Sequence, residues 1–124
     1  MHVWSRTVGG ELELAPIIKV FKHLAPRHLR IELTGGRALE VTGEHPFFDP
    51  KSGNYRKAET FKAGEVVWLE DFTPKGKNKK KRPSSGRSIE IQAIKVIKGD
   101  IEVFNIEVGG NHNYFAEGIL VHNK

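Results

Sequence analysis

The 124 residues, of which 38% are hydrophobic and 28% charged, suit one domain with a single core and are too few for two independent cores. Lysine and arginine number 20 against 15 aspartate and glutamate residues, so the net charge is +5, which allows weak binding to anionic partners without requiring it. There is no cysteine, which excludes a disulfide framework, a thiolate metal site and a cysteine nucleophile within this chain.

The first third of the chain predicts strands joined by tight turns. Apolar residues that alternate imperfectly favour one long strand over residues 12–24. We expect a bend or bulge at Pro16, because proline cannot donate a ladder hydrogen bond. Residues 29–33 and 39–41 are apolar at every second position and flank a Gly-Gly pair, the pattern of a β-hairpin.

The pattern after this hairpin is mixed. Residues 49–54 are rich in turn-forming residues. Residues 58–63 favour one short helical turn, and residues 66–69 read as the next strand.

A basic segment over residues 73–88 interrupts the strand pattern. It contains no aliphatic or aromatic side chain, so we expect a flexible, solvated loop. Four of its basic side chains are weak candidates for contacts with nucleic-acid phosphates: Lys79, Lys80, Lys81 and Arg82. No aromatic residues are interleaved to stack on bases, which favours the solvated loop.

The last third of the chain again predicts strands. Residues 89–97 and 101–108 flank a Lys-Gly-Asp turn, and short strands follow at 114–115 and 119–121. Many short strands with regular turns indicate an all-β fold. We therefore expect residues 1–124 to form a single all-β domain that carries the basic loop.

Histidines stand at three positions that could carry chemistry. His45 closes the sequence Thr42-Gly-Glu-His before a proline, and His112 follows a Gly-Gly turn. His122 precedes Asn123 near the last residue. Taken singly, each is explained by an ordinary structural role, such as a turn residue or a frayed end.

Together and in this order, these segments resemble the motifs of the Hint domain, the module shared by Hedgehog autoprocessing domains and inteins. Residues 39–48 resemble its Thr-x-x-His block, and 57–67 the usual continuation. Residues 103–108, 111–115 and 118–123 resemble its two C-terminal blocks, including the closing His-Asn pair. The nearest likeness is to the bacterial pretoxin type found within polymorphic toxins. The resemblance implies a Hint-type, horseshoe-like β fold.

The chain departs from the family pattern at both ends. The family's N-terminal block, which begins with a cysteine or serine nucleophile, has no counterpart, and the residues after His2 resemble the end of that block's second strand. We therefore expect the first strands of the fold to be missing. Lys124 follows the closing asparagine where splicing uses Cys, Ser or Thr, so we expect no full splicing from this chain alone. Asn105 stands where many relatives carry aspartate.

One reaction of the family needs neither nucleophile. The resemblance implies that the amide nitrogen of Asn123 attacks its own backbone carbonyl, which forms a succinimide and releases Lys124 in a single turnover. By position in the family, His122 polarises the scissile carbonyl or donates to its oxyanion, and His112 acts as acid and base around the Asn123 side chain. Histidine suits both tasks because its pKa lies near neutrality.

The resemblance also implies partners. Thr42 and His45 act in relatives on an N-terminal scissile amide, so their role here requires an N-terminal Hint or intein fragment supplied in trans. A C-terminal extein or payload would follow Asn123. We expect no cofactor and no required metal, since no His-x-x-x-His spacing occurs. The alternatives are an inactive Hint-like scaffold, half of a split intein, and a basic nucleic-acid-binding β module.

The sequence gives little information on localisation. No stretch approaches the ~18 apolar residues of a membrane-spanning helix, and the first residues lack the basic start and apolar region of a signal peptide. The bacterial likeness favours a cytoplasmic protein or part of an exported precursor.

Overall fold

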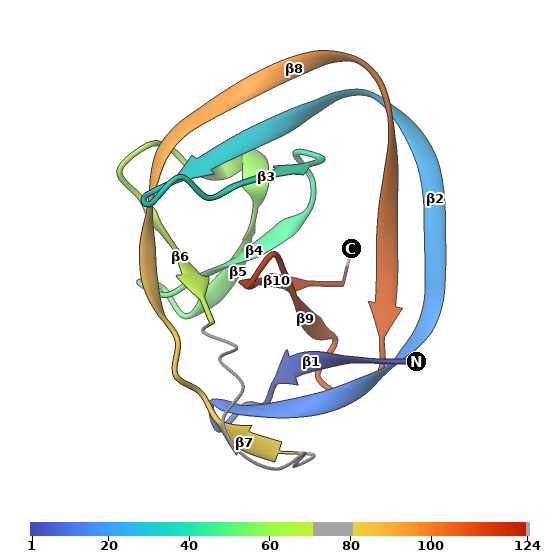
Figure 1. Ribbon diagram of the computed structural model, residues 1–124, viewed down its shortest axis with the longest axis vertical. Coiled ribbons are helices and arrows are strands. Elements are labelled where there is room, and N and C mark those ends of the chain that lie inside the picture. Colours follow the sequence, from blue (N-terminus) through green and yellow to red (C-terminus); the bar gives the residue numbers. More distant parts are fainter. Residues whose placement is uncertain (71–80, 124) are drawn as a thin grey trace.

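The computed structural model describes residues 1–70 and 81–123, with the backbone alone for residues 81–83. The described residues form strands and one short 3-10 helix (Figure 1). In chain order they are β1 (His2–Arg6), β2 (Glu11–Leu33), β3 (Ala38–Val41), β4 (Pro46–Asp49), β5 (Asn54–Lys57), η1 (Ala58–Thr60), β6 (Val66–Leu69), β7 (Lys81–Pro83), β8 (Arg87–Val108), β9 (Asn113–Ala116) and β10 (Ile119–His122). None of the helices in these two ranges is long and apolar enough to cross a membrane.

A long antiparallel ribbon made by β2 and β8 frames the fold and curves around the shorter strands (Figure 1). Its pairing runs from Ile17 opposite Val108 to Leu33 opposite Ile91. The register shifts at three places, after Ile17, after Ala25 and after Glu32. Because a bulge bends its strand and increases the local twist, these shifts account for the curvature of the ribbon.

The continuity of this ribbon differs from the sequence-based expectation. The segments 12–24 and 29–33, expected as separate strands, belong to the single strand β2. The segments 89–97 and 101–108 likewise belong to β8, which runs through the Lys-Gly-Asp sequence expected to turn. In both strands the turn-forming residues are accommodated within the ladder, because Gly99 adopts a positive φ of 123° and the register shifts after Ala25.

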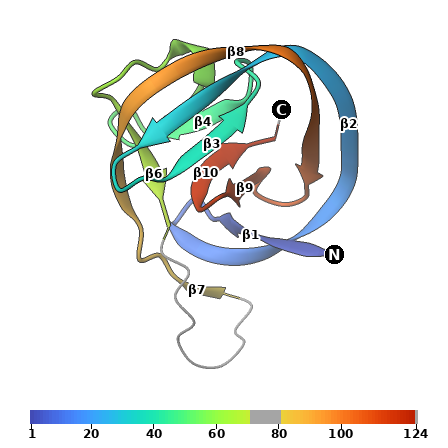
Figure 2. The ribbon, with the colours of Figure 1, turned by 45° about the horizontal axis from the view of Figure 1, so that its top comes forward.

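The shorter strands lie inside the curve of the ribbon. There β10 pairs with β4, β6 and β9, and β4 pairs with β5. The apolar core lies between these strands and the inner side of the ribbon; its fully buried members include Ile31, Phe47, Val67, Ile91 and Ile119. Figure 2 shows β9 and β10 near the centre of the curve, with the C-terminal end of the chain beside them.

Several predicted elements are confirmed. The hairpin of β2 and β3 pairs Leu29 with Val41 and Glu32 with Ala38 on either side of the Gly-Gly turn. The strand expected at 66–69 is β6, and the short helical turn is η1. The fold class is all-β, as the alternating pattern indicated.

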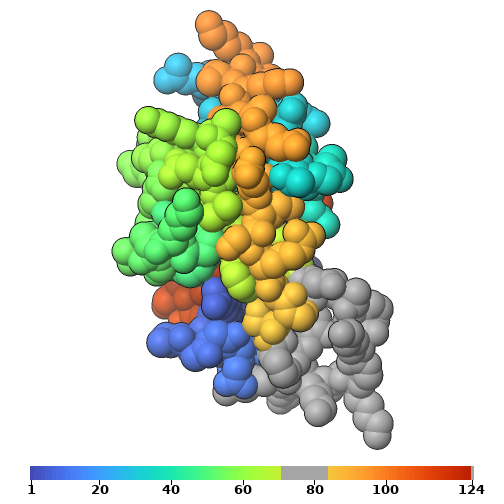
Figure 3. Space-filling view, turned by 90° about the vertical axis from the view of Figure 1, so that its left-hand side faces the viewer, coloured from blue at the N-terminus to red at the C-terminus, as the bar shows by residue number. Residues whose placement is uncertain are grey.

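The basic segment over residues 73–88 falls only partly within the described residues, which resume at residue 81. Its last part does not form the expected loop, because β7 pairs with β2 and β8 begins at Arg87. The buried carboxylate of Glu70 accepts hydrogen bonds from Ser84 Oγ at 2.7 Å and from the Ser85 backbone N–H at 2.6 Å. This carboxylate therefore joins the residue after β6 to the residues that lead into β8. Figure 3 shows the molecule from the left-hand side of Figure 1, where the orange residues of β8 run beside the green residues that include β4 to β6.

Candidate functional site

Asn123 follows β10 directly and is held by the end of β8. Its Oδ1 accepts a hydrogen bond from the Val108 N–H at 3.2 Å, and its Nδ2 donates to the Val108 carbonyl at 3.0 Å. Its backbone N–H donates to the His112 carbonyl at 2.8 Å. The amide of Asn123 thus pairs with the Val108 backbone as a neighbouring strand would, which restricts both the main chain and the side chain of the asparagine.

The imidazole of His122 lies against the carbonyl group of Asn123. Its Nδ1 is 2.9 Å from the Asn123 carbonyl oxygen, which belongs to the peptide bond that joins Asn123 to Lys124. A carbonyl oxygen only accepts hydrogen bonds, so this contact requires the proton on Nδ1. The ring also packs edge-to-face against Tyr55, with centroids 4.8 Å apart and an interplanar angle of 67°.

Tyr55 is in turn held by a buried asparagine. Asn113 is 7% exposed, and its Nδ2 donates to the Tyr55 hydroxyl and to the Arg6 carbonyl, both at 3.0 Å. Its Oδ1 accepts from the Arg6 N–H at 2.7 Å. Burial raises the pKa of the Tyr55 hydroxyl, although the Asn113 bond and the Arg6 charge lower it in part. The hydroxyl therefore stays neutral and hydrogen-bonded at physiological pH.

A cleft of about 500 Å³ opens beside these residues. Its lining includes Arg6, Phe48, Tyr55, Asn111, Asn113 and His122, which come from five different segments. The cleft gives the imidazole of His122 access to solvent. A histidine that takes up and releases protons needs such access.

His112 reaches Asn123 through its backbone. It adopts a left-handed conformation with φ 58°, which aims its carbonyl at the Asn123 N–H. Its side chain is exposed. In the described part of the chain, no hydrogen bond joins the His112 ring to Asn123, so the acid-base contact expected from the sequence is not formed there.

Thr42 and His45 lie in the turn between β3 and β4, and Phe47 of β4 pairs with Val121 of β10. The His45 N–H donates to the Thr42 carbonyl at 3.2 Å, and the His45 ring is buried, with its Nε2 3.3 Å from the Tyr114 hydroxyl. Burial raises the pKa of Tyr114 to about 12, so this hydroxyl remains protonated at neutral pH. Tyr114 follows Asn113 in β9, so neighbouring residues of one strand contact the two groups of predicted site residues.

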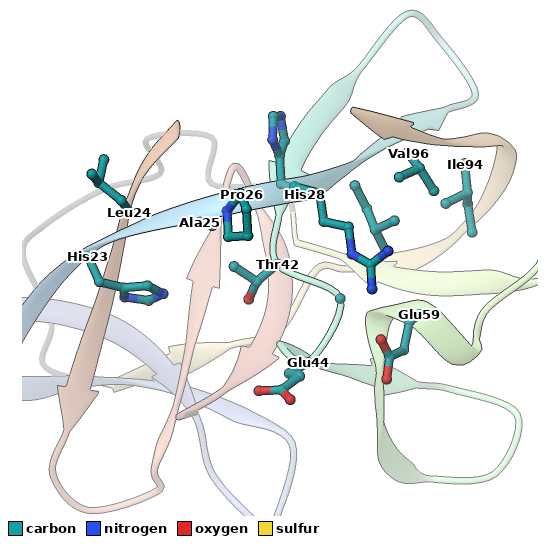
Figure 4. Close-up of a pocket in the computed structure, with 13 residues that line it drawn as sticks. His23, Leu24, Ala25, Pro26, His28, Thr42, Glu44, Glu59, Ile94 and Val96 are labelled. Atoms are coloured by element: carbon teal, nitrogen blue, oxygen red, sulfur yellow. The ribbon is translucent and has the colours of Figure 1, made fainter. Parts of the chain in front are cut away.

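A second cleft, of about 570 Å³, separates Thr42 from the ribbon (Figure 4). It is lined on one side by residues 23–29 of β2 and on the other by residues 42–44 and Glu59. Thr42 lines this cleft, whereas His122 lines the cleft beside Tyr55. The structure thus groups His122, Asn123 and the His112 backbone, and the His45 ring lies beside the same strands through Tyr114, which pairs with Val121 of β10.

Two further expectations concern ligands. Lys79 and Lys80 lie outside the described residues, as do the side chains of Lys81 and Arg82, so the phosphate-binding interpretation stays a prediction. Within residues 1–70 and 81–123, no three histidine, cysteine, aspartate or glutamate side chains gather as a metal site would require.

Sequence reasoning did not find the contributions of Tyr55, Asn113 and Val108. Asn113 lies within a quoted motif, but nothing in the pattern links it to Tyr55, which is 58 residues away. Val108 acts through its backbone, which leaves no trace in the choice of side chain. No local signal identified these three residues.

Comparison with known protein families gives one match over nearly the whole chain. The family described as the intein splicing domain matches residues 2–123. No curated protein matches the sequence significantly.

Comparison with solved structures gives many matches. The Ssp DnaB mini-intein variant M86 superposes with a TM-score of 0.78 at 22% identity, covering 99% of this chain and 76% of that chain. The bacterial intein-like domain from Clostridium thermocellum gives 0.77 at 19% identity, with 98% and 79% covered. The PabCDC21-1 intein gives 0.79 at 25% identity, with 99% and 70% covered. At these identities the likeness is one of fold.

Proposed function

The chain belongs to the intein splicing domain family, and from this premise we propose that it cleaves the peptide bond after Asn123 by cyclisation of the asparagine side chain. Its fold is the Hint-type β fold of inteins, as the sequence motifs indicated. A domain of this family lies in a precursor between the segments that it processes, so its partners are flanking or separately supplied fragments. Cleavage after Asn123 is the step for which this chain carries the residues.

The observation that carries the proposal is the position of His122. When nitrogen attacks the Asn123 carbonyl carbon, negative charge develops on the carbonyl oxygen, and His122 Nδ1 lies 2.9 Å from that oxygen. A donor already in place costs no reorganisation during the reaction, and one such donor typically contributes about 10²–10³-fold in rate. The hydrogen bond from Nδ2 to the Val108 carbonyl supports the attack, because it draws electron density toward the nitrogen.

The reaction balances without water or a cofactor. A bond forms between Asn123 Nδ2 and the Asn123 carbonyl carbon, and the bond from that carbon to the nitrogen of Lys124 breaks. Nδ2 loses one proton, and the departing amine of Lys124 gains one. The products are a chain that ends in a succinimide at residue 123 and a free downstream segment, so each molecule reacts once.

The other predicted residues take narrower roles in this proposal. His112 fixes the main chain of Asn123 through its carbonyl, at 2.8 Å. We assign Thr42 and His45 to an N-terminal junction formed with a Hint or intein fragment supplied in trans. The likeness to pretoxin domains makes a toxin-like payload the segment released after Asn123.

Intact mass spectrometry of a fusion tests the proposal. A reporter protein is attached after Lys124, and the mass of the chain is followed over time at neutral pH beside an Asn123→Ala variant. We expect release of the reporter and a remaining fragment one water lighter than the hydrolysed product, both absent in the variant. An intact fusion after days, even with a separate N-terminal Hint fragment added, identifies an inactive scaffold and overturns the proposal.

A further inference from the structure

The orientation of the His122 ring is not set by its own strand. β10 fixes the backbone of residue 122, but the ring still turns about two side-chain bonds. If it rotated by a quarter of a turn about the bond to the ring, Nδ1 would swing away from the Asn123 carbonyl oxygen. The contact at 2.9 Å therefore depends on whatever restrains this rotation.

Tyr55 supplies a restraint from outside the motif blocks. Its ring meets the His122 ring edge-to-face at 4.8 Å, a geometry that aromatic pairs prefer and that rotation of the imidazole out of its plane would change. A second ring, that of Phe48, packs on Tyr55 at 5.4 Å. Tyr55 is thus packed between the strand that precedes it and the histidine.

The position of Tyr55 is itself determined by Asn113. β5 is the last strand in the order of the sheet, and Tyr55 pairs with Phe48 on one side. The hydrogen bond from Asn113 Nδ2 at 3.0 Å holds the far end of the tyrosine. Asn113 is fixed in turn by its two bonds to the Arg6 backbone, so its amide has one orientation.

We propose that Tyr55, held by Asn113, is the positioning residue that keeps Nδ1–H of His122 on the scissile carbonyl. This inference rests on the proposed function, because the carbonyl is the one that Asn123 attacks. Tyr55 does not touch the reacting atoms. Its effect passes through the ring of His122, which it contacts edge-to-face.

The first test is the rate of cleavage in the reporter fusion. Tyr55→Leu removes the ring, and we expect cleavage on the order of tenfold to a hundredfold slower, the range that misplacement of a reacting group produces. Tyr55→Phe keeps the ring contact and loses the bond to Asn113, so its rate should fall between those of the parent and Tyr55→Leu. Phe104→Leu is the matched control, since Phe104 is an exposed aromatic residue on the ribbon and its rate should equal that of the parent.

The second test reads the histidine directly and does not need cleavage. Nitrogen chemical shifts of the His122 ring are measured by NMR in an Asn123→Ala background, which keeps the chain intact. We expect the neutral ring to hold its proton on Nδ1, and Tyr55→Leu to give a mixture of both tautomers. An unchanged tautomer together with an unchanged rate overturns the role of Tyr55. If the parent fusion does not cleave but the tautomer depends on Tyr55, the positioning role stands and the proposed function fails.

Discussion

At the scale of single residues, the candidate site depends on where one proton lies. The bond to the Asn123 carbonyl uses Nδ1 of His122, so the ring donates only while that nitrogen is protonated. We expect His122→Ala to slow cleavage after Asn123 by about 10²–10³-fold, the usual loss when an oxyanion donor is removed. Single-turnover release of a fused reporter, followed by gel densitometry, measures the rate.

A matched control accompanies this prediction. His2→Ala removes an exposed histidine from β1, and its cleavage rate should equal that of the parent chain. A His122→Ala rate within about threefold of the parent would show that the imidazole contributes nothing like a full oxyanion donor.

Variants of His112 distinguish a role of its backbone carbonyl from a role of its imidazole. Its φ of 58° is one that glycine adopts freely and alanine adopts at a cost of about 1–2 kcal/mol. If the carbonyl is what holds Asn123, His112→Gly and His112→Ala should both cleave within about threefold of the parent, and the glycine variant should be the more stable of the two, since histidine and alanine both carry a Cβ at this φ. Cleavage rates and thermal unfolding of both variants check this. Slow cleavage in both variants would assign the function to the imidazole.

At the scale of elements, the sheet carries a tight junction where the chain enters β8. An added Cβ at Gly86 would meet Trp68 Nε1 and would lie 2.6 Å from Glu70 Oε2, closer than real Cβ contacts come. Gly86→Ala should therefore destabilise the fold by about 1–3 kcal/mol, the usual cost of overpacking. Urea unfolding measures it.

Gly9 gives the comparison for Gly86. The nearest atom to an added Cβ there is Thr7 Oγ1 at 3.8 Å, an ordinary contact. Gly9→Ala should leave the free energy of unfolding within about 0.5 kcal/mol of the parent. Equal losses in the two variants would mean that the junction at Glu70 is not tightly packed.

How far the sequence predicts these elements depends on the range of the interactions. The hairpin of β2 and β3 and the strand β6 follow from alternation within a few residues, which the sequence displays. The continuity of β2 through Pro26 and of β8 through Gly99 does not, because the pairing of the two strands overrides local turn signals. The His122–Asn123 pair stands out as a motif, whereas the contact of Tyr55 with His122 spans 67 residues and leaves no local pattern.

At the scale of the whole molecule, one arginine links the small strands electrostatically. Arg56 Nη1 lies 3.1 Å from Asp49 Oδ2 and 3.0 Å from Glu65 Oε2. The bond to Arg56 holds the pKa of Glu65 below its ordinary value of 4.5. Burial raises the pKa of Asp49, but the bonds from Arg56 and from the Lys51 N–H outweigh it, and the net pKa is lowered.

Acid should therefore lower the free energy of unfolding, because it protonates the carboxylates of Asp49 and Glu65 that pair with Arg56. A carboxylate with a lowered folded-state pKa stabilises the fold above its unfolded pKa and loses that contribution as the pH falls through the folded one. We expect the free energy of unfolding to fall from about pH 5 downward, and less steeply in Arg56→Met. Urea unfolding over a pH series tests this. Parallel pH curves for parent and variant would show that Arg56 does not couple to the two acids.

The two hydrogen bonds between Val108 and Asn123 also determine at which stage of folding the candidate site is formed. Val108 is paired with Ile17, so the two backbone groups that bind the Asn123 amide belong to a ribbon whose partners are 91 positions apart in sequence. Pairings between distant segments form slowly, because a long loop must close before they stabilise anything. In the proposed function, the bond after residue 123 becomes reactive only after synthesis has passed it and the ribbon has closed. Slow ribbon closure would then give a segment after Asn123 time to emerge from the ribosome before cleavage.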